Sequence, residues 1–233
     1  MTTEIFDLFG MDIYVSEDHR FGTDALLLAR FSMPSPKDNV CDLCSGCGIV
    51  PMLFFALGNV PAKAYAVEIQ DEAVELMNRS VEKNALKDRL IPVKADLTKD
   101  DELLAVPRGK MELVTVNPPY YKSRSGAERL SPAQAAARHE LFCDLEQVIR
   151  AASILLKYGG NLKMCHLPER LTDVFCLMRK YGIEPKILQF AHNKDTSDRP
   201  FLALISGKKG GKSGLIVEKP VTVENMNAEL FGK

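Results

Sequence analysis

Short apolar runs alternate with segments of helical periodicity through most of the chain. Apolar runs of strand length occupy 39–43, 62–69, 90–95, 111–116 and 161–166. Apolar residues at helical spacing predict helices at 49–57, 73–84, 145–157 and 169–181. Gly159-Gly160 is expected to end the third of these helices. Further strands are predicted at 186–191 and 201–205. Strands that alternate with helices predict a parallel, doubly wound α/β sheet.

The first 36 residues precede this alternation. Two short strands are predicted within residues 5–15, on either side of Gly10. A helix is predicted at 25–31, with Thr23 or Asp24 as its cap. We therefore expect an amino-terminal hairpin and helix at 1–36, followed by a single globular unit at 37–233.

Composition excludes several classes of protein. The 233 residues are 46% hydrophobic and 26% charged, as in ordinary soluble globular proteins. The net charge of -1 gives no overall attraction to nucleic acid, so such a partner needs a local basic patch. The first ten residues lack the basic region of a signal peptide, and no apolar run has the length of a membrane span. We expect a cytoplasmic protein whose six cysteines are reduced thiols.

The sequence Asn117-Pro118-Pro119-Tyr120 ends the apolar run at 111–116. A strand must stop at two consecutive prolines, because neither donates a backbone hydrogen bond. The residue before each proline is also held in an extended conformation. These residues are therefore expected at the carboxyl end of a strand, the edge at which open α/β sheets bind ligands.

The same tetrapeptide offers chemistry suited to an –NH2 group. The Asn117 side-chain oxygen and the Pro118 carbonyl are fixed acceptors for its two hydrogens. Holding both hydrogens leaves the nitrogen lone pair directed at an electrophile, which is catalysis by positioning. The Tyr120 ring adds a face on which a flat base or amide would stack. The alternative interpretation is an ordinary turn after a strand.

Three further features follow consecutive predicted strands. Gly46 and Gly48 lie in a loop that lets backbone approach a ligand and directs a helix amino terminus at negative charge. Glu68 lies 20 residues after Gly48, the spacing at which an acid accepts hydrogen bonds from ribose hydroxyls. Asp96 is placed to accept from an adenine amino group, and Asp42 lies just ahead of the glycines. Together they predict an adenosine ligand, either NAD or S-adenosylmethionine.

The loop distinguishes these two ligands. Its sequence is not G-x-G-x-x-G, because Cys44 stands before Gly46-Cys47-Gly48. That departure argues against a dinucleotide. S-adenosylmethionine is favoured for a second reason, because it supplies the electrophile that the Asn117 site lacks.

Together these motifs resemble the class I S-adenosylmethionine-dependent methyltransferases that modify an exocyclic or amide –NH2 group, in the motif order of the gamma-type amino methyltransferases. The wider chain is similar to the tRNA1(Val) adenine-37 N6-methyltransferase family. The similarity rests on segments 21–28 (FGTDALLL), 117–121 (NPPYY), 137–140 (ARHE) and 210–214 (GGKSG). The NPPY tetrapeptide is specific for the type of reaction and not for the substrate. The family carries glycine where Cys44 stands here, and glycine adopts positive φ freely.

The resemblance implies a fold and a set of site residues. The implied fold is Rossmann-like, with a mostly parallel doubly wound sheet, an antiparallel C-terminal strand, and residues 1–36 covering the cofactor site. The residues expected to bind S-adenosylmethionine are Thr23, Asp42, Cys44, Gly46, Gly48, Glu68, Ile69, Asp96, Leu97 and Asn117. The expected catalytic residues are Asn117, Pro118 and Tyr120. The expected substrate-binding residues are Pro119, Tyr120, Tyr121, Lys122, Arg124 and Arg138.

Other motifs carry less weight, and no metal is expected. Cys41-x-x-Cys44-x-x-Cys47 resembles the start of an iron–sulfur run but lacks a fourth cysteine at position 50, so thiols are expected. Residues 206–213 approximate a phosphate loop, but a strand is predicted after them, so a basic turn is expected. The four histidines show no metal-ligand spacing.

We predict methyl transfer from S-adenosylmethionine to adenine N6 in RNA, with tRNA as the expected substrate. A base is extruded most readily from a single-stranded loop. In the protein, residues 123–136 are polar and are expected to form a loop over the site. Basic residues within 122–138 would usually be solvated there, but here they are candidates for phosphate contact. One alternative is a protein glutamine N5-methyltransferase, although too few residues precede position 39 for the separate helical domain of those enzymes. The others are a catalytically silent RNA-binding module and a DNA adenine target.

Overall fold

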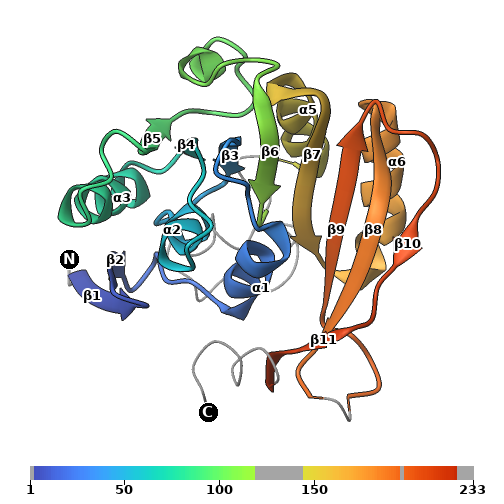
Figure 1. The fold of residues 1–233 in the computed structure, drawn as a ribbon, viewed down its shortest axis with the longest axis horizontal. Helices are drawn as coiled ribbons and strands as arrows, with labels where there is room; N and C mark the ends of the chain where they lie inside the picture. The colour runs from blue at the N-terminus through green and yellow to red at the C-terminus, as the bar shows by residue number, and fades with distance from the viewer. Residues whose placement is uncertain (1–2, 119–143, 195–196, 225–233) are drawn as a thin grey trace, which may run out of the picture.

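The computed structural model describes residues 3–118, 144–194 and 197–224. Within them one mixed sheet runs in the order β10-β8-β9-β7-β6-β3-β4-β5, and β11 also pairs with β8 (Figure 1). Its strands are β3 Asn39–Leu43, β4 Lys63–Glu68, β5 Leu90–Lys94, β6 Met111–Val116, β7 Leu156–His166, β8 Ile183–His192, β9 Leu202–Lys209, β10 Ile216–Val217 and β11 Val221–Thr222.

The direction of the strands matches the expected fold class. Strands β3 to β7 are parallel to their neighbours within that group. Strand β9, near the carboxyl terminus, is antiparallel to both β7 and β8. The expectation of a mostly parallel, doubly wound sheet with an antiparallel C-terminal strand is therefore confirmed.

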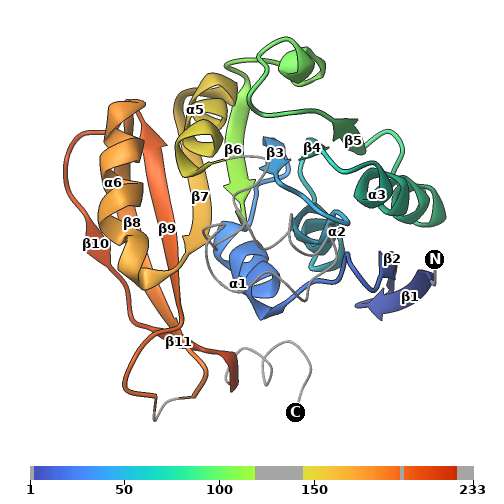
Figure 2. The same cartoon turned by 180° about the vertical axis from the view of Figure 1, so that it is seen from behind.

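Helices cover both faces of the sheet, because successive strand residues point to opposite sides. Val40 belongs to the hydrophobic core beneath α1, α2 and α3, whereas the next residue, Cys41, belongs to the core beneath α5 and α6. The two views of the ribbon show these helix groups on opposite faces (Figure 2). The helices are α1 Thr23–Ser32, α2 Ile49–Ala56, α3 Asp71–Lys83, α5 Leu145–Leu155 and α6 Leu171–Lys180, with short 3-10 helices η1 Glu102–Ala105 and η3 Pro168–Arg170.

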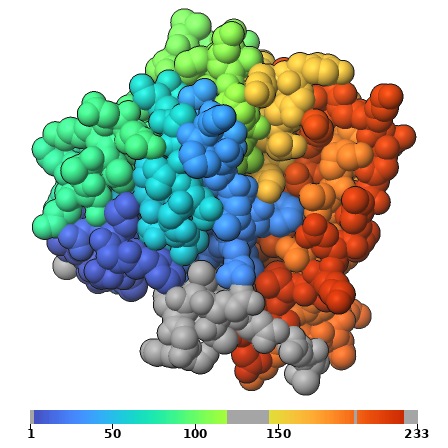
Figure 3. All heavy atoms as spheres, viewed as in Figure 1, coloured from blue at the N-terminus to red at the C-terminus, as the bar shows by residue number. Residues whose placement is uncertain are grey.

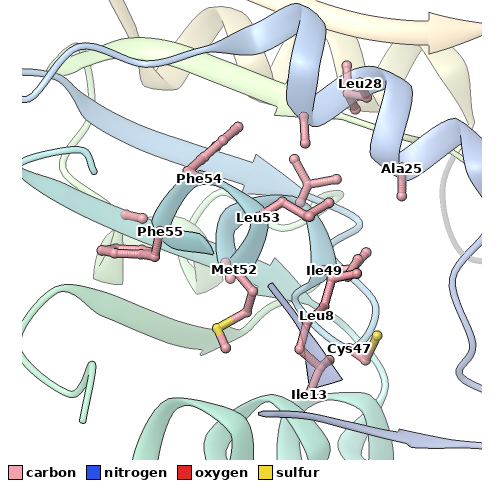
Figure 4. Close-up of a cluster of buried hydrophobic side chains, with 14 of the residues drawn as sticks. Leu8, Ile13, Ala25, Leu28, Cys47, Ile49, Met52, Leu53, Phe54 and Phe55 are labelled. Carbon is pink, nitrogen blue, oxygen red and sulfur yellow. The ribbon is translucent and has the colours of Figure 1, made fainter. Parts of the chain in front are cut away.

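The amino-terminal hairpin packs against α3 and α2. Its strands, β1 Thr3–Leu8 and β2 Met11–Ser16, pair antiparallel, as expected. The Asn84 side chain accepts from Asp12 N at 3.0 Å and donates to Asp12 O at 2.7 Å, which ties β2 to the end of α3. Leu8 and Ile13 are buried beside Ile49 of α2 (Figure 4). The space-filling view shows the hairpin against the flank formed by α3 (Figure 3).

The expected boundary between α5 and the fifth strand of the α/β pattern is wrong. A helix to residue 157 and a strand from 161 were expected, but α5 ends at Leu155 and β7 begins at Leu156. Gly159 and Gly160, which suggested a helix end, lie inside the strand. Gly159 has a φ of 81°, and a Cβ on Gly160 would lie 2.8 Å from the Met111 carbonyl oxygen. The glycines therefore permit a register irregularity between β6 and β7, at a point where the two backbones approach too closely for a side chain.

The strand order reverses between β3 and β6. These strands are parallel, and their last residues, Leu43 and Val116, are partners in the pairing register. The segments that follow them therefore start side by side at one edge of the sheet. In open α/β sheets such a reversal leaves a crevice where ligands bind.

Candidate active site

A cavity of about 890 Å³ opens where β3 and β6 end. Its described walls come from within residues 17–25, from within 42–50, from 117–118, and from residues 167, 201 and 202. A volume of this size lies in the range of small-molecule and cofactor sites. Six of the expected site residues line it together: Thr23, Asp42, Cys44, Gly46, Asn117 and Pro118.

The loop between β3 and α2 takes a left-handed backbone conformation at three positions. The φ angle is 54° at Cys44, 55° at Gly46 and 81° at Gly48. Gly48 is also closely packed, because a Cβ there would lie 2.7 Å from Met77 Cγ on α3. Cys44 therefore adopts the geometry that glycine takes freely, at a strain of about 1–2 kcal/mol. The left-handed turn is therefore present even though cysteine stands where the resembling family carries glycine.

Glu68 ends β4, and its carboxylate accepts backbone hydrogen bonds. Oε2 accepts from Gly46 N at 2.9 Å, while Oε1 accepts from Ile69 N at 2.9 Å and from Gln70 N at 3.1 Å. The carboxylate thus ties the β3–α2 loop to the end of β4. Neither Glu68 nor Ile69 is among the described residues that line the cavity. The expected contact of Glu68 with ribose hydroxyls stays a prediction.

Asp96 and Leu97 follow β5, two strands away from β3. Asp96 Oδ1 accepts from Thr98 N at 2.9 Å and from Thr98 Oγ1 at 2.7 Å. Leu97 is buried in the core shared with α5 and α6. Neither residue is among the described lining of the cavity, and their expected contacts with the cofactor stay predictions.

Asp42 is a buried carboxyl group between two hydroxyls. Ser45 Oγ donates to Oδ2 and Thr115 Oγ1 donates to Oδ1, both at 2.6 Å. Burial raises the pKa of Asp42 to about 7; the two hydrogen bonds oppose this rise, and the Glu68 charge adds to it. Because Thr115 lies on β6, the group joins β6 to the β3–α2 loop across the point where the strand order reverses. Sequence reasoning missed Ser45, a variable position inside the glycine loop, and Thr115, which belongs to no motif.

Asn117 is held at both ends of its carboxamide. Its Nδ2 donates to Asp24 Oδ2 at 3.1 Å, and Cys165 Sγ donates to its Oδ1 at 3.1 Å. Asp24 lies in the first turn of α1, and Cys165 lies near the carboxyl end of β7. Three segments far apart in the sequence thus converge on one side chain.

Sequence reasoning missed both partners of Asn117. It assigned Thr23 or Asp24 to the cap of α1, which is wrong: Gly22 is the N-cap residue, and this described helix start has no side-chain cap hydrogen bond. The available signals were an acid at the start of an apolar helix and a cysteine at the end of a strand. Neither signal specifies a partner 93 or 48 positions away.

All six of the expected substrate-binding residues lie outside the described part of the chain. They are Pro119, Tyr120, Tyr121, Lys122, Arg124 and Arg138. The loop expected over the site, at 123–136, lies outside it as well. The roles assigned to these residues stay predictions.

The remaining sequence motifs form no second site in the described structure. Burial raises the pKa of the Cys41 thiol well above its usual range and that of Cys47 to about 12, and both are free thiols. Within residues 3–118, 144–194 and 197–224, no group of three His, Cys, Asp or Glu side chains is arranged to hold a metal ion. The segment 206–213 runs from β9 into a turn and then into β10, as expected. None of the described helices has the length and apolarity needed to cross a membrane.

The sequence matches known methyltransferases. The family model of the methyltransferase small domain matches residues 12–169. The tRNA1(Val) (adenine(37)-N6)-methyltransferase of Porphyromonas gingivalis is 27% identical over 179 residues, which cover 75% of this chain and 69% of that protein. The protein of the same name from Flavobacterium psychrophilum is 27% identical over 202 residues, which cover 85% and 83%.

Solved structures share the fold. The M. jannaschii tRNA m1G37 methyltransferase aligns with a TM-score of 0.61 at 21% identity, over 91% of this chain and 58% of that one. M. jannaschii TYW2 in complex with AdoMet aligns with a TM-score of 0.60 at 13% identity, over 89% and 85%. At these identities the likeness shows a Rossmann-like methyltransferase fold. Because the family model spans more than half of the sequence, including β3, β6 and the loop between β3 and α2, the chain belongs to the methyltransferase small domain family and is a methyltransferase.

Proposed function

We propose that the enzyme transfers a methyl group from S-adenosylmethionine to the N6 amino group of adenine in RNA, with a tRNA as its substrate. The observation that carries this proposal is the position of Asn117. Its carboxamide lines the same cavity as the Gly46 loop, at the carboxyl edge of β3 and β6. An acceptor for an amino group and a loop suited to a nucleoside cofactor therefore lie in one cavity.

The cavity fits S-adenosylmethionine in size and in chemistry. A volume of about 890 Å³ lies within the range of cofactor sites. Apart from Gly46 and its two chain neighbours, none of the described residues has a heavy atom within 4 Å of where a Gly46 Cβ would stand, so a ligand can approach this backbone closely. When bound, S-adenosylmethionine supplies an electrophilic methyl group. The proposed cofactor-binding set is Thr23, Asp42, Cys44, Gly46, Gly48, Glu68, Ile69, Asp96, Leu97 and Asn117. In this set Asn117 stands beside the methyl group and mainly orients the amine, so its side chain adds little to cofactor affinity.

Asn117 and Pro118 hold the amino group that is methylated. The Asn117 Oδ1 and the Pro118 carbonyl oxygen accept its two N–H bonds, which directs the nitrogen lone pair into the cavity. The chain supplies orientation and charge stabilisation and needs no strong general base, because the N6 proton becomes acidic as the nitrogen is alkylated. Loss of one positioned hydrogen-bonding group of this kind lowers a rate by about 10²–10³ in other enzymes.

Adenine N6 is the proposed target because of the relatives and of the geometry of the amine. The relatives from P. gingivalis and F. psychrophilum are named tRNA1(Val) (adenine(37)-N6)-methyltransferases. Adenine N6 is a planar –NH2 group that two fixed acceptors accommodate, and a base in a single-stranded loop is extruded at low cost. Pro119, Tyr120 and Tyr121 are proposed to contact the base, and Lys122, Arg124 and Arg138 the phosphates.

The test is incubation of the purified protein with total bacterial RNA and labelled S-adenosylmethionine, followed by mass spectrometry of the nucleosides. Labelled N6-methyladenosine is the expected product, and treatment of the RNA with ribonuclease beforehand should remove it. Label in another nucleoside, such as a methylated guanosine, would contradict the adenine assignment. Label recovered in protein glutamine would contradict the RNA assignment.

A further inference from the structure

The two ends of the Asn117 carboxamide have opposite hydrogen-bonding roles. Oδ1 accepts hydrogen bonds and the Nδ2 group donates them, yet a half-turn about the terminal side-chain bond exchanges the two with little change in shape. With Oδ1 toward the substrate, Asn117 binds an amine; with Nδ2 there, two donors face each other. A site that uses this side chain therefore needs a neighbour that selects one orientation.

The Asp24 carboxylate makes that selection. An ionised carboxylate accepts hydrogen bonds and donates none, so it pairs with the Nδ2 end of Asn117 and not with Oδ1. Asp24 Oδ2 lies 3.1 Å from Asn117 Nδ2, and Asp24 Oδ1 accepts from Ala25 N at 3.1 Å, which orients the carboxylate. The Cys165 thiol, 3.1 Å from Oδ1, favours the same orientation because it donates. A carbonyl oxygen such as Oδ1 has the capacity for a second hydrogen bond.

Helix α1 holds Asp24 in place. Its residue Leu28 is fully buried, in a hydrophobic cluster that also contains residues of α2. At the other end of the helix, Lys163 Nζ on β7 donates to Phe31 O at 2.6 Å and to Ser32 O at 3.1 Å. A cation at the last carbonyls of a helix stabilises that end. Lys163 thus fixes the end of the helix against β7, and Asp24 fixes its start against Asn117, the residue that follows β6.

We propose that Asp24 is a positioning residue that sets the orientation of the Asn117 carboxamide and keeps Oδ1 for the substrate amine. This inference rests on the proposed function, because only an enzyme that grips an –NH2 group needs that orientation. Asp24 also lines the cavity, so direct contact with the cofactor is the competing role. The two roles differ in what a change at position 24 does to turnover and to cofactor affinity.

The kinetic test exchanges the two side chains through the variants D24N, N117D and D24N/N117D. D24N places an amide against an amide, which accepts either orientation, and N117D places two carboxylates together. Each single change should lower kcat by about 10- to 100-fold, with the Kd for S-adenosylmethionine changed less than about twofold. The double variant restores a donor–acceptor pair of reversed polarity, with an acceptor still available at position 117. The kcat of the double variant should be about tenfold or more above the value expected if the two single effects were independent and multiplied.

The control for lost charge is E75Q, because Glu75 is an exposed carboxylate on α3 that is not among the described residues lining the cavity. E75Q should retain kcat within about twofold, as expected for an exposed side chain. Independent effects of D24N and N117D would overturn the positioning role. A D24N variant with normal kcat and weakened S-adenosylmethionine binding would overturn it in favour of cofactor contact.

A second readout does not depend on activity. The NMR signals of the Asn117 side-chain –NH2 group, assigned by their loss in N117A, should shift and exchange faster with water in D24N but not in E75Q. Signals that do not respond to D24N would overturn the inference. If the signals respond as expected while the wild-type protein methylates no adenine, the proposed function fails and the Asp24–Asn117 pairing stands.

Discussion

The polar residues at and beside the cavity act mainly by joining segments that are adjacent in the sheet. Asp42 connects the β3–α2 loop to β6 through Thr115, and Glu68 connects the same loop to the end of β4. Buried hydrogen bonds of this kind strengthen one another in a low dielectric and hold a site in one geometry. Sequence alone identified Asn117 and Asp42, because their signals are local. It could not identify Thr115, since its role depends on strand register.

The buried Asp42 carboxyl predicts an unusual pH dependence of stability. In the unfolded chain this group loses its proton near 3.8, but burial raises its pKa in the folded state to about 7. Between these values the folded state holds the extra proton, so the contribution of Asp42 to stability falls as pH rises. Relative to the Asp42→Asn variant, the wild-type free energy of unfolding should therefore decrease by as much as about 4 kcal/mol from pH 4 to pH 7.

The measurement is urea unfolding of both proteins at several pH values. The difference between the two proteins is used because His166 titrates in the same pH range and changes the free energy of unfolding in the opposite direction. Burial lowers the pKa of His166 to about 4, so its contribution is present above its unfolded value of 6.5 and is lost as pH falls through 4. A wild-type minus Asp42→Asn difference that does not change with pH would show that the folded carboxyl is not perturbed.

At the scale of elements, local patterns located most strands and helices but not the exceptions. The helical spacing of apolar residues in α3 and the short apolar run of β6, which ends at two prolines, decide those elements by themselves. The start of β7 could not be found, because Gly159 and Gly160 suggest a helix end until the close approach of Met111 is known. Attachment of the hairpin to α3 was also hidden, since it depends on side chains such as Ser80 and Asn84, whose partners in the hairpin no local pattern specifies.

We predict that Asn84→Ala loosens the amino-terminal hairpin. The change removes the hydrogen bonds of the side chain to Asp12 N and Asp12 O, and another to Ser80 O at 2.7 Å. Loss of partners for partly buried backbone groups should lower the free energy of unfolding by about 1–3 kcal/mol. Hydrogen exchange at Asp12 should accelerate more than exchange in the central strands.

The matched control is Asn78→Ala, because Asn78 is an exposed asparagine on the same helix. It should change the free energy of unfolding by no more than about 0.5 kcal/mol. Equal effects of the two substitutions would show that the hairpin does not depend on the Asn84 contacts.

At the scale of the whole molecule, the site follows from the order of the strands. Parallel strands β3 and β6 lie side by side where the order reverses, so the Gly46 loop and Asn117 reach one cavity although 71 positions of sequence separate them. Sequence predicted this meeting because βα alternation restricts where strand ends can lie. The approach of α1 was expected only from the family resemblance and not from the residue pattern, because the packing of that helix depends on core contacts with α2 and on Lys163.

The central claim is that Asn117 orients the amine toward a methyl donor held in the adjoining cavity. Single-turnover methyl transfer by Asn117→Ala, with the Kd for S-adenosylmethionine measured separately, tests it most directly. The account predicts a rate at least about 100-fold below wild type with a Kd changed less than about twofold, because the substitution removes an acceptor for the substrate and leaves the glycine loop intact. A near-wild-type rate, or a loss explained entirely by weaker cofactor binding, would contradict it.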